Sequence, residues 1–264
     1  MQVFEFDGAR IAAQIDGSDD DAVVLIHGFP LSHAIWNRQT PVLAAKHRTI
    51  AIDLRGMGAS SVSPGPYLME TLAGDVAALL DTLGIERATL VGHSLGGYVA
   101  LAFARMYIER VARLALVCSR IDADSPERVV ERNELASRAE SSASNAVFCN
   151  DAFSAMFAPK TREQHSEIVE NARKTAENND YRGLAAMQRG MALREGSFDI
   201  AGDLGMPVLM VAGAEDPVLS VAEAERMAGC FPAGQLEVAR SSGHLPMLEE
   251  PAWLGEVLAA FTAG

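Results

Sequence analysis

The stretch Gly92-His93-Ser94-Leu95-Gly96-Gly97 follows a short aliphatic run at residues 89–91 and opens a segment with helical spacing. A serine in a G-x-S-x-G pattern between a strand and a helix is typical of a nucleophile elbow, the sharp turn that exposes a serine hydroxyl. Glycines flank the serine there because the backbone segments pass too closely for a Cβ atom. The N-terminus of the following helix favours negative charge that develops nearby. A glycine-rich turn can hold a serine by chance, but the flanking strand and helix favour Ser94 as a nucleophile.

A serine hydroxyl is a weak nucleophile at neutral pH and needs a base that a carboxylate orients. Asp216 comes just past a predicted strand at residues 206–211 and is followed by Pro217. His244 lies in a loop between a predicted strand at residues 236–238 and a predicted helix at residues 253–261. Asp216 could instead simply form an Asp-Pro turn, and His244 could be a solvated loop histidine. Glu215 is an adjacent candidate for the role of the acid. The chain order Ser, Asp, His nevertheless predicts Ser94 as nucleophile, Asp216 as orienting acid and His244 as general base.

A second loop at a strand end supplies the remaining part of such a site. His27-Gly28-Phe29-Pro30 follows the aliphatic run at residues 23–26. The backbone N–H of Phe29, with that of Leu95, is predicted to form an oxyanion hole for a tetrahedral intermediate. For His27 and His93 a structural role, in bridging loops or in packing, is the better interpretation.

Aliphatic runs alternate with helical patterns on both sides of these loops. Runs without polar alternation predict strands buried on both faces, and their alternation with helices predicts a parallel sheet with helices on both faces; the runs lie at residues 23–26, 49–52, 89–91, 114–117 and 206–211. Residues 3–6 and 11–15 flank Asp7-Gly8 and predict an antiparallel hairpin at the start. Residues 122–199 hold no strand-like run and predict a helical insertion. We therefore expect a core in two parts, residues 1–120 and 204–264, with a helical cap at residues 121–203.

Composition excludes several classes of protein. The chain has 264 residues with a formal net charge of −13, and no long basic run, which argues against nucleic-acid and membrane-surface partners. No apolar stretch is long enough for a membrane helix and no leader-like segment opens the chain, so a cytoplasmic location is expected. Cys118, Cys149 and Cys230 lack metal or disulfide spacing, and we expect them to be reduced and buried, with no metal site. The expected partner is a small molecule with an apolar acyl part; a homodimer stays open.

These blocks together resemble the α/β-hydrolase fold superfamily, in its serine-nucleophile form with an inserted cap. The resemblance covers nearly the whole chain and rests on residues 27–30, 53–60, 92–97, 213–217 and 243–244. It implies an α/β fold with a mostly parallel, eight-stranded sheet, helices on both faces and no cofactor. Met57 departs from the pattern, because similar proteins usually carry a histidine or an aromatic residue there, near the expected pocket rim.

Residues 53–60 are rich in glycine, so a phosphate-binding loop was the alternative for that block. It lacks both the G-x-G-x-x-G pattern and the Lys-Ser/Thr ending of a P-loop. A structural turn, with Asp53 and Arg55 in local hydrogen bonds, is the prediction.

The cap and the loops around Ser94 supply candidates for substrate contact. Apolar side chains here predict a ceiling over Ser94, although most of them also fit a role in holding the cap helices together; the candidates are Phe29, Trp36, Phe148, Phe153, Met156, Phe157, Met187 and Leu245. Arg162, Arg182 and Arg189 could meet a substrate carboxylate, but charged residues on helices are usually solvated, and we select none of them.

The sequence therefore predicts a serine hydrolase that cleaves a small ester, thioester or lactone through an acyl-enzyme on Ser94. The serine argues against haloalkane dehalogenases and epoxide hydrolases, which carry aspartate at the elbow. Carboxylesterases, enol-lactonases, carbon–carbon bond hydrolases and cofactor-free haloperoxidase-like perhydrolases stay open as related activities. The alternative of another class is a ligand-binding or receptor protein without turnover, and the presence of all three of Ser94, Asp216 and His244 argues against it.

Overall fold

A computed structural model describes residues 1–18 and 21–263 and places their strands in one sheet. The strand order is β1-β2-β4-β3-β5-β6-β7-β8, which confirms the predicted eight-stranded sheet. β1 and β2 pair antiparallel, as do β2 and β4, and all other neighbours pair parallel. The strands are β1 (Gln2–Phe6), β2 (Ala9–Asp16), β3 (Ala22–Ile26), β4 (Arg48–Ile52), β5 (Ala88–His93), β6 (Val111–Val117), β7 (Val208–Gly213) and β8 (Gly234–Ala239).

The central strands are buried along their whole length, as their unbroken aliphatic runs predict. Every residue of β3, β5 and β7 is buried. In the register of the sheet, Val24 of β3 lies between Ile50 of β4 and Leu90 of β5. β8, at the edge, alternates between half-buried and exposed residues instead. The core thus centres on β3 and β5, the two strands that lead into the predicted oxyanion loop and the nucleophile turn.

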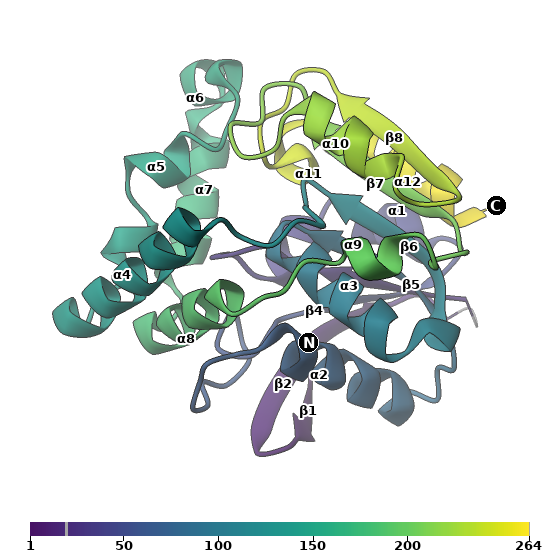
Figure 1. Cartoon of the computed structure of the whole chain (residues 1–264), viewed down its shortest axis with the longest axis horizontal. Coiled ribbons are helices and arrows are strands. Elements are labelled where there is room, and N and C mark those ends of the chain that lie inside the picture. The colour runs from purple at the N-terminus through teal and green to yellow at the C-terminus, as the bar shows by residue number, and fades with distance from the viewer. Residues whose placement is uncertain (19–20, 264) are drawn as a thin grey trace.

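Helices cover both faces of the sheet (Figure 1). α2 packs against α3, which also contacts β5 and β6, and α1 packs against α12. α2 buries the apolar stripe that its sequence predicts, including Leu72, Val76 and Leu80. The core helices are α1 (Thr40–Ala44), α2 (Met69–Thr82), α3 (Leu95–Met106), α9 (Phe198–Ala201), α10 (Val221–Ala228), α11 (Pro246–Glu249) and α12 (Pro251–Ala263).

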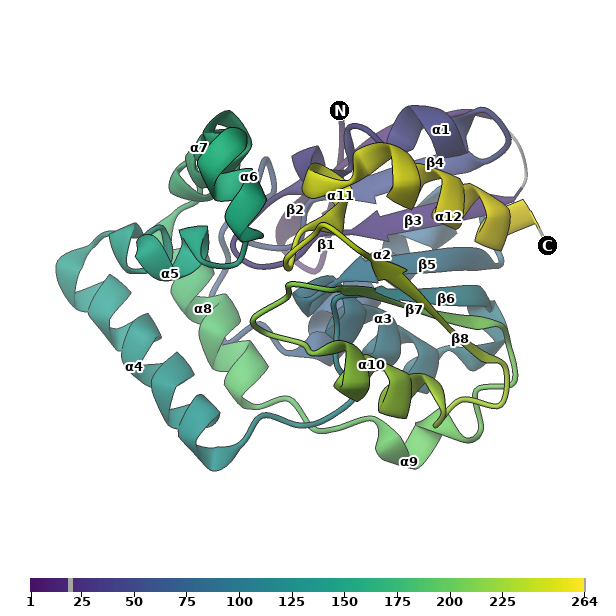
Figure 2. The same ribbon diagram turned by 90° about the horizontal axis from the view of Figure 1, so that it is seen from above.

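Between β6 and β7 the chain forms a group of helices at the end of the sheet where β3 and β5 finish (Figure 2). They are α4 (Pro126–Ser142), α5 (Asp151–Ser154), α6 (Pro159–Gln164), α7 (Ser166–Glu177) and α8 (Tyr181–Ala192). The start of α4 is capped by Ser125, whose side chain accepts a hydrogen bond from the Arg128 N–H, and Asp180 caps α8 in the same way. We call α4–α8 the cap.

The backbone of α8 lies in close contact with the backbone of the core, because α8 has glycines at the points of contact. A Cβ atom added to Gly190 would lie 1.7 Å from the Tyr67 carbonyl oxygen, and one added to Gly183 would lie 2.2 Å from that of Gly56. Between these two glycines, the Ala186 carbonyl accepts a hydrogen bond from the Tyr67 N–H at 3.1 Å. This contact sets the position of the cap above the strand ends.

Some expectations for individual residues were wrong. Cys118 and Cys149 are free and buried, but Cys230 is half-buried on the surface, where its thiol donates to the Arg226 carbonyl. Met57 is 1% exposed and packs in the core rather than at a pocket rim. In the described residues, no helix has both the length and the apolar character needed to cross a membrane.

Candidate active site

Ser94 stands in a strained turn between β5 and α3. Its φ is 48° and its ψ is −112°, a conformation that non-glycine residues rarely adopt. Its N–H donates to the Val117 carbonyl at 2.9 Å, and its carbonyl accepts from the Ser119 hydroxyl at 2.7 Å. The end of β6 and the residues just after it therefore hold the Ser94 backbone in place, as a nucleophile elbow requires.

Gly96 is required where α3 passes under the oxyanion loop. A Cβ atom there would lie 2.2 Å from the Ile26 carbonyl oxygen, a backbone atom that cannot turn away. We expect Gly96→Ala to lower the free energy of unfolding by about 2 kcal/mol or more, through this overpacking. The matched control is Gly74→Ala in α2, where nothing lies within 4 Å of the added Cβ. There the better helix propensity of alanine should raise stability, and equal denaturation midpoints for the two variants would contradict the account.

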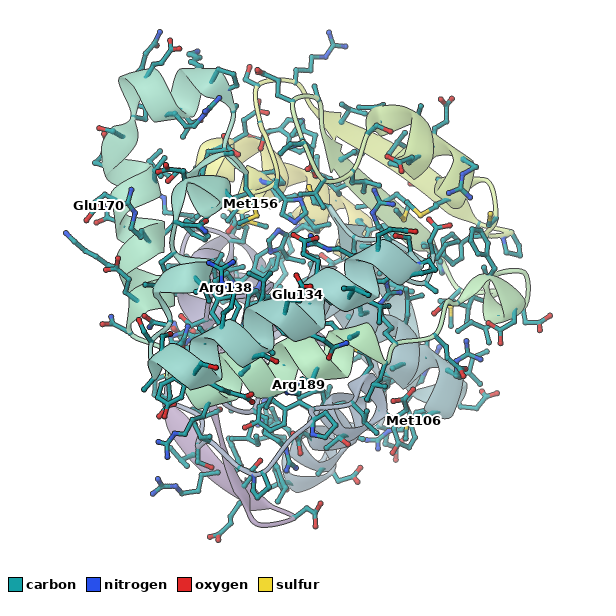
Figure 3. The ribbon with its side chains drawn as sticks, turned by 60° about the vertical axis from the view of Figure 1, so that its left-hand side comes forward. Met106, Glu134, Arg138, Met156, Glu170 and Arg189 are labelled. Atoms are coloured by element: carbon teal, nitrogen blue, oxygen red, sulfur yellow. The ribbon has the colours of Figure 1, made fainter. Side chains whose placement is uncertain are left out.

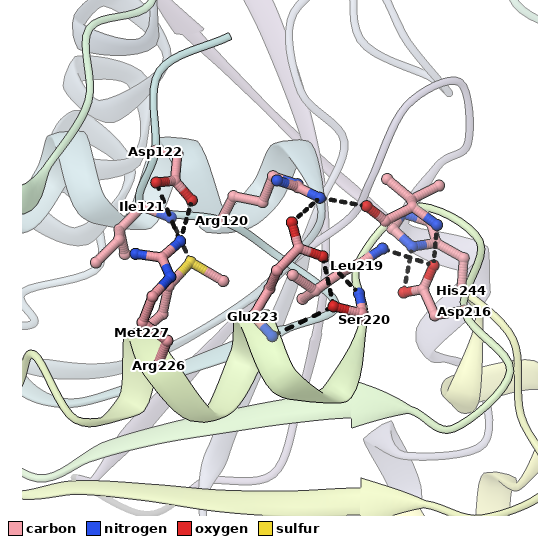
Figure 4. A network of polar contacts seen from close by, with 11 residues as sticks. Arg120, Ile121, Asp122, Asp216, Leu219, Ser220, Glu223, Arg226, Met227 and His244 are labelled. Carbon is pink, nitrogen blue, oxygen red and sulfur yellow. Dashed lines mark hydrogen bonds and ion pairs between the residues drawn. The ribbon is translucent and has the colours of Figure 1, made fainter. Parts of the chain in front are cut away.

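His244 and Asp216 form a hydrogen-bonded pair (Figure 4). The His244 Nδ1 lies 2.8 Å from the Asp216 Oδ2, and both side chains are almost fully buried. Asp216 Oδ1 accepts from the N–H groups of Val218 at 2.7 Å and Leu219 at 3.2 Å. Burial alone would raise the pKa of the Asp216 carboxyl, but the nearby His244 and these hydrogen bonds outweigh it and hold that pKa below its usual value. Asp216 is thus a carboxylate, and it orients the imidazole.

A polar network that the sequence did not reveal supports the Asp216 turn. Arg120, just past β6, donates to the Val218 carbonyl and to the Glu223 carboxylate at 3.1 Å (Figure 4). Glu223 also completes a capping box with Ser220 at the start of α10. The network ties the turn after β7 to the end of β6, two strand ends that border the site.

His93 anchors the His244 loop through a hydrogen bond to its backbone. The His93 Nε2 lies 2.9 Å from the His244 carbonyl oxygen, and it donates there. Complete burial lowers the pKa of His93 to about 3, with a further contribution from His244, so His93 is neutral. The Gly28 Cα also sits against the ring, since a Cβ there would lie 2.4 Å from the His93 Nδ1. His93 therefore has the anchoring role that its sequence position indicated.

Glu249 joins the same loop to the cap. Its Oε2 accepts from the Ala158 N–H at 2.8 Å and the Thr161 hydroxyl at 2.7 Å, and its Oε1 accepts from the Gly243 N–H at 2.9 Å. Burial raises the pKa of the Glu249 carboxyl, and these hydrogen bonds partly oppose the rise. No sequence motif marks Glu249, because its cap partners lie about 90 residues away in the chain.

We expect Glu249→Gln to loosen the His244 loop, since the amide NH₂ would face a donor. Losing a buried acceptor should lower the free energy of unfolding by about 1–3 kcal/mol and, through misplacement of His244, lower kcat more than it raises KM. Thermal denaturation and steady-state kinetics measure both effects. The control is Glu256→Gln, at an exposed position on α12. Identical kinetics for the two variants would show that Glu249 does not position His244.

The two N–H groups predicted for the oxyanion hole are both free. Among residues 1–18 and 21–263, neither the Phe29 nor the Leu95 N–H has a hydrogen-bond acceptor. The Phe29 loop is fixed by His27, whose Nδ1 donates to the Gly28 carbonyl at 3.0 Å and whose Nε2 accepts from the Leu54 N–H at 3.0 Å. Free donors next to a half-buried serine that lines a cavity are suited to bind an oxyanion.

Ser94 and His244 both line a cavity of about 540 Å³ between the cap and the core. Of the predicted substrate-contact residues, half share this cavity, namely Phe29, Phe148, Phe153 and Met156. The Phe29 and Phe148 rings meet edge to face, with centroids 5.2 Å apart. The other half, Trp36, Phe157, Met187 and Leu245, do not line it and lie buried in the core, which corrects the expectation.

Sequence reasoning missed other residues of the cavity wall. Tyr98 of α3, Gln188 of α8 and several residues of α4 line the cavity. Met191 of α8, which the apolar pattern of the cap also suggests as part of the ceiling over Ser94, lines it too. The arginines considered earlier, Arg162, Arg182 and Arg189, do not. Spacing of i, i+4 between Arg128 and Arg132 was the one available signal that α4 presents a basic face.

Cys118, Asp216 and His244 also place potential metal-ligand atoms within 4.8 Å of one another. Burial raises the pKa of the Cys118 thiol well above its usual value, so the thiolate that a metal requires is disfavoured. The Asp216–His244 hydrogen bond already uses the facing atoms of that pair. The arrangement is therefore better suited to proton transfer than to metal binding. Asp53 accepts a hydrogen bond within its own loop, from the Ala59 N–H at 2.9 Å, as predicted, whereas Arg55 donates to Asp75, 20 residues away in the chain.

Comparison with known proteins identifies relatives of this chain. A family model for the alpha/beta hydrolase fold matches residues 21–251. The 3-oxoadipate enol-lactonase 2 of Acinetobacter baylyi is 29% identical over 263 residues, covering 95% of this chain and 94% of that protein. A thermophilic esterase from Thermogutta terrifontis, solved with malate bound, has a TM-score of 0.95 at 34% identity, over 99% of this chain and 98% of its own.

A further solved structure, the enol-lactonase from Burkholderia xenovorans LB400, has a TM-score of 0.91 at 24% identity and covers 100% of both chains. At that identity the likeness shows the shared fold alone.

Proposed function

The chain belongs to the alpha/beta hydrolase fold family, and from that premise we propose that it is a serine hydrolase of small esters, thioesters or lactones that acts through an acyl-enzyme on Ser94. The observation that carries the proposal is the cavity itself. It brings the strained serine turn, the His244–Asp216 pair and an apolar wall to one place. The esterase and the enol-lactonase among the relatives support this reaction class.

In the first half of the proposed reaction, His244 takes the proton of the Ser94 hydroxyl as its oxygen attacks the substrate carbonyl. Asp216 keeps the proton of the imidazole on Nδ1, so that Nε2 is free to act as the base, and it stabilises the imidazolium that forms. The N–H groups of Phe29 and Leu95 bind the oxyanion. Collapse of the intermediate breaks the bond to the leaving group, which takes the proton from His244.

In the second half, water replaces the leaving group. His244 removes a proton from the water as it attacks the acyl carbonyl, and the ester bond to Ser94 breaks. The proton returns to the Ser94 oxygen, and the carboxylic acid product leaves through the cavity. A lactone follows the same steps, except that its leaving group stays attached to the acyl part.

Hydrolysis of p-nitrophenyl esters from acetyl to dodecanoyl tests the proposal. We expect turnover of short and medium acyl chains, because Phe29, Phe148, Phe153 and Met156 form an apolar wall in a cavity of about 540 Å³. The acyl-chain length with the highest rate measures how much of this cavity the acyl part fills. The rate of p-nitrophenolate release at saturating ester measures the profile, and no hydrolysis of any ester would contradict it.

Covalent labelling and substrate preference, measured on the same preparation, distinguish the related activities. A carbon–carbon bond hydrolase or a perhydrolase would also be labelled at Ser94 by a fluorophosphonate, but would prefer a vinylogous diketone or a peroxide co-substrate to the simple esters. A ligand-binding protein without turnover would hydrolyse none of these substrates. The free oxyanion donors and the Asp216–His244 pair favour an enzyme over a ligand-binding protein, and the esterase and enol-lactonase relatives support the ester or lactone reaction among the related activities.

A further inference from the structure

We propose that Tyr98 is a specificity-determining residue of the catalytic cavity, the cavity of about 540 Å³ that Ser94 and His244 line. Its ring separates this cavity from a smaller pocket and thereby limits the length of the acyl chain that the cavity accepts. Arg194 is the positioning residue that holds the ring in place. The inference rests on the proposed function, because it concerns the acyl part that Ser94 would carry.

Tyr98 lies where two cavities meet. It is on α3, one helical turn after Ser94, and it is 7% exposed. It lines the catalytic cavity and also a pocket of about 50 Å³. Within the described residues no other residue lines both, so Tyr98 is the wall that they share. The rest of the smaller pocket comes from the start of α2, from α3 and from residues 194–197.

The smaller pocket has an apolar side close to the ring. Leu101 and Ala102 line it and follow Tyr98 at i+3 and i+4, so they lie on the same face of α3. Glu70 and Arg105 supply its polar side. If the ring were removed, the two cavities would join, and the space of the ring itself would become available to the methylene groups of a longer acyl chain.

Arg194 holds the ring from the side of the smaller pocket. Its guanidinium carbon lies 3.9 Å from the centroid of the Tyr98 ring, which is a close cation–π contact, and its side chain is only 5% exposed. Arg194 lines the smaller pocket, but in the part of the chain that the structure describes it does not line the catalytic cavity. It therefore acts on the catalytic cavity through Tyr98.

Arg194 is itself held by the segment that leads into the cap. It donates to the Asp122 carbonyl and, at 3.2 Å, to the Asp124 carboxylate. Nearby, the Ser197 N–H donates to the Ile121 carbonyl at 2.7 Å. The first of these segments precedes α4 and the second follows α8, and the two helices lie side by side (Figure 3). The entry and the exit of the cap are thus tied together where Arg194 meets the ring.

The test uses p-nitrophenyl esters from acetyl to dodecanoyl, each below the concentration at which it aggregates. The measured quantity is the ratio of kcat/KM for the decanoyl ester to that for the butanoyl ester. This ratio does not depend on the fraction of the protein that is active, so partial unfolding does not imitate the effect. We expect Tyr98→Ala to raise the ratio about tenfold or more, since room for two more buried methylene groups corresponds to that factor.

Tyr98→Leu is the second variant. It keeps a large apolar side chain on α3, so it tests the same change if the alanine variant does not fold. It should raise the ratio in the same direction but by less, because it frees less space.

Arg194→Gln tests how the ring is held. It should raise the ratio about two- to fivefold, the size of one cation–π contact. In the Tyr98→Ala background it should have no further effect, because no ring is left to hold. The matched control is Arg226→Gln. Arg226 pairs with the Asp122 carboxylate on the surface and, within the described ranges, lines neither cavity, so this variant should keep the wild-type ratio.

Each outcome separates the inference from the proposed function. If both Tyr98 variants lower the rates of all esters alike and leave the ratio unchanged, Tyr98 does not limit the acyl chain, and the inference is wrong while the proposed function stands. If Arg194→Gln changes the ratio equally with and without the ring, Arg194 does not act through Tyr98. If the wild type hydrolyses no ester, the inference and the proposed function fail together.

Discussion

Replacing Ser94 by alanine is expected to lower kcat/KM for any ester by at least about 10⁴-fold, the effect of losing the nucleophile in serine hydrolases. Without the hydroxyl no acyl-enzyme can form, and the oxyanion donors alone retain a small part of the acceleration. The protein should stay folded. Within the described residues the Ser94 hydroxyl makes no hydrogen bond, so its removal leaves no buried partner unsatisfied. The thermal midpoint should therefore stay close to that of the wild type.

The control for this variant is Ser154→Ala, on α5 and outside the catalytic cavity. It should keep the wild-type kcat/KM. Comparable hydrolysis by Ser94→Ala and the wild type, with both folded, would mean that the nucleophile lies elsewhere.

Asp216→Asn is expected to have an effect of similar size, about 10⁴-fold on kcat, by analogy with the same change in a serine protease. The asparagine oxygen would keep the hydrogen bonds from Val218 and Leu219, so its NH₂ group would face the His244 Nδ1. His244 would then carry its proton on Nε2, where it cannot accept the proton of Ser94. The loss should appear in kcat rather than in KM, because no substrate contact changes.

The matched control is Glu215→Gln, the exposed neighbour that competed with Asp216 in the sequence. We expect its kcat to stay near the wild-type value. A large loss of kcat in Glu215→Gln together with a small loss in Asp216→Asn would mean that Glu215, and not Asp216, is the orienting acid.

The sequence was sufficient for the features that depend on local pattern. Buried strands such as β3 and β5 follow from unbroken aliphatic runs, and the turn at Ser94 follows from glycines at positions where a Cβ atom would meet backbone. Asp216 could be preferred to Glu215 because of its place next to Pro217. The structure then brings Asp216 and His244, 28 residues apart in the chain, to hydrogen-bonding distance.

Features that depend on the direction of a side chain were not predictable in this way. Met187 and Met191 both lie on α8 and are both apolar, yet the second lines the cavity and the first packs in the core. Hydrophobicity predicts that such a residue is buried, but it does not predict whether the side chain faces the core or the cavity. Glu249 and Arg120 escaped notice for another reason, since their partners are about 90 and 100 residues away and share no motif with them.

The most direct test of the central claim is to identify the residue that becomes covalently modified. A fluorophosphonate forms a stable bond with an activated serine oxygen, so intact-mass measurement followed by peptide mapping locates the nucleophile. We expect one adduct per chain, on the peptide that contains Ser94, with parallel loss of ester hydrolysis and no adduct in Ser94→Ala. An adduct on a different residue, or full hydrolysis by a protein that the reagent does not modify, would contradict the account.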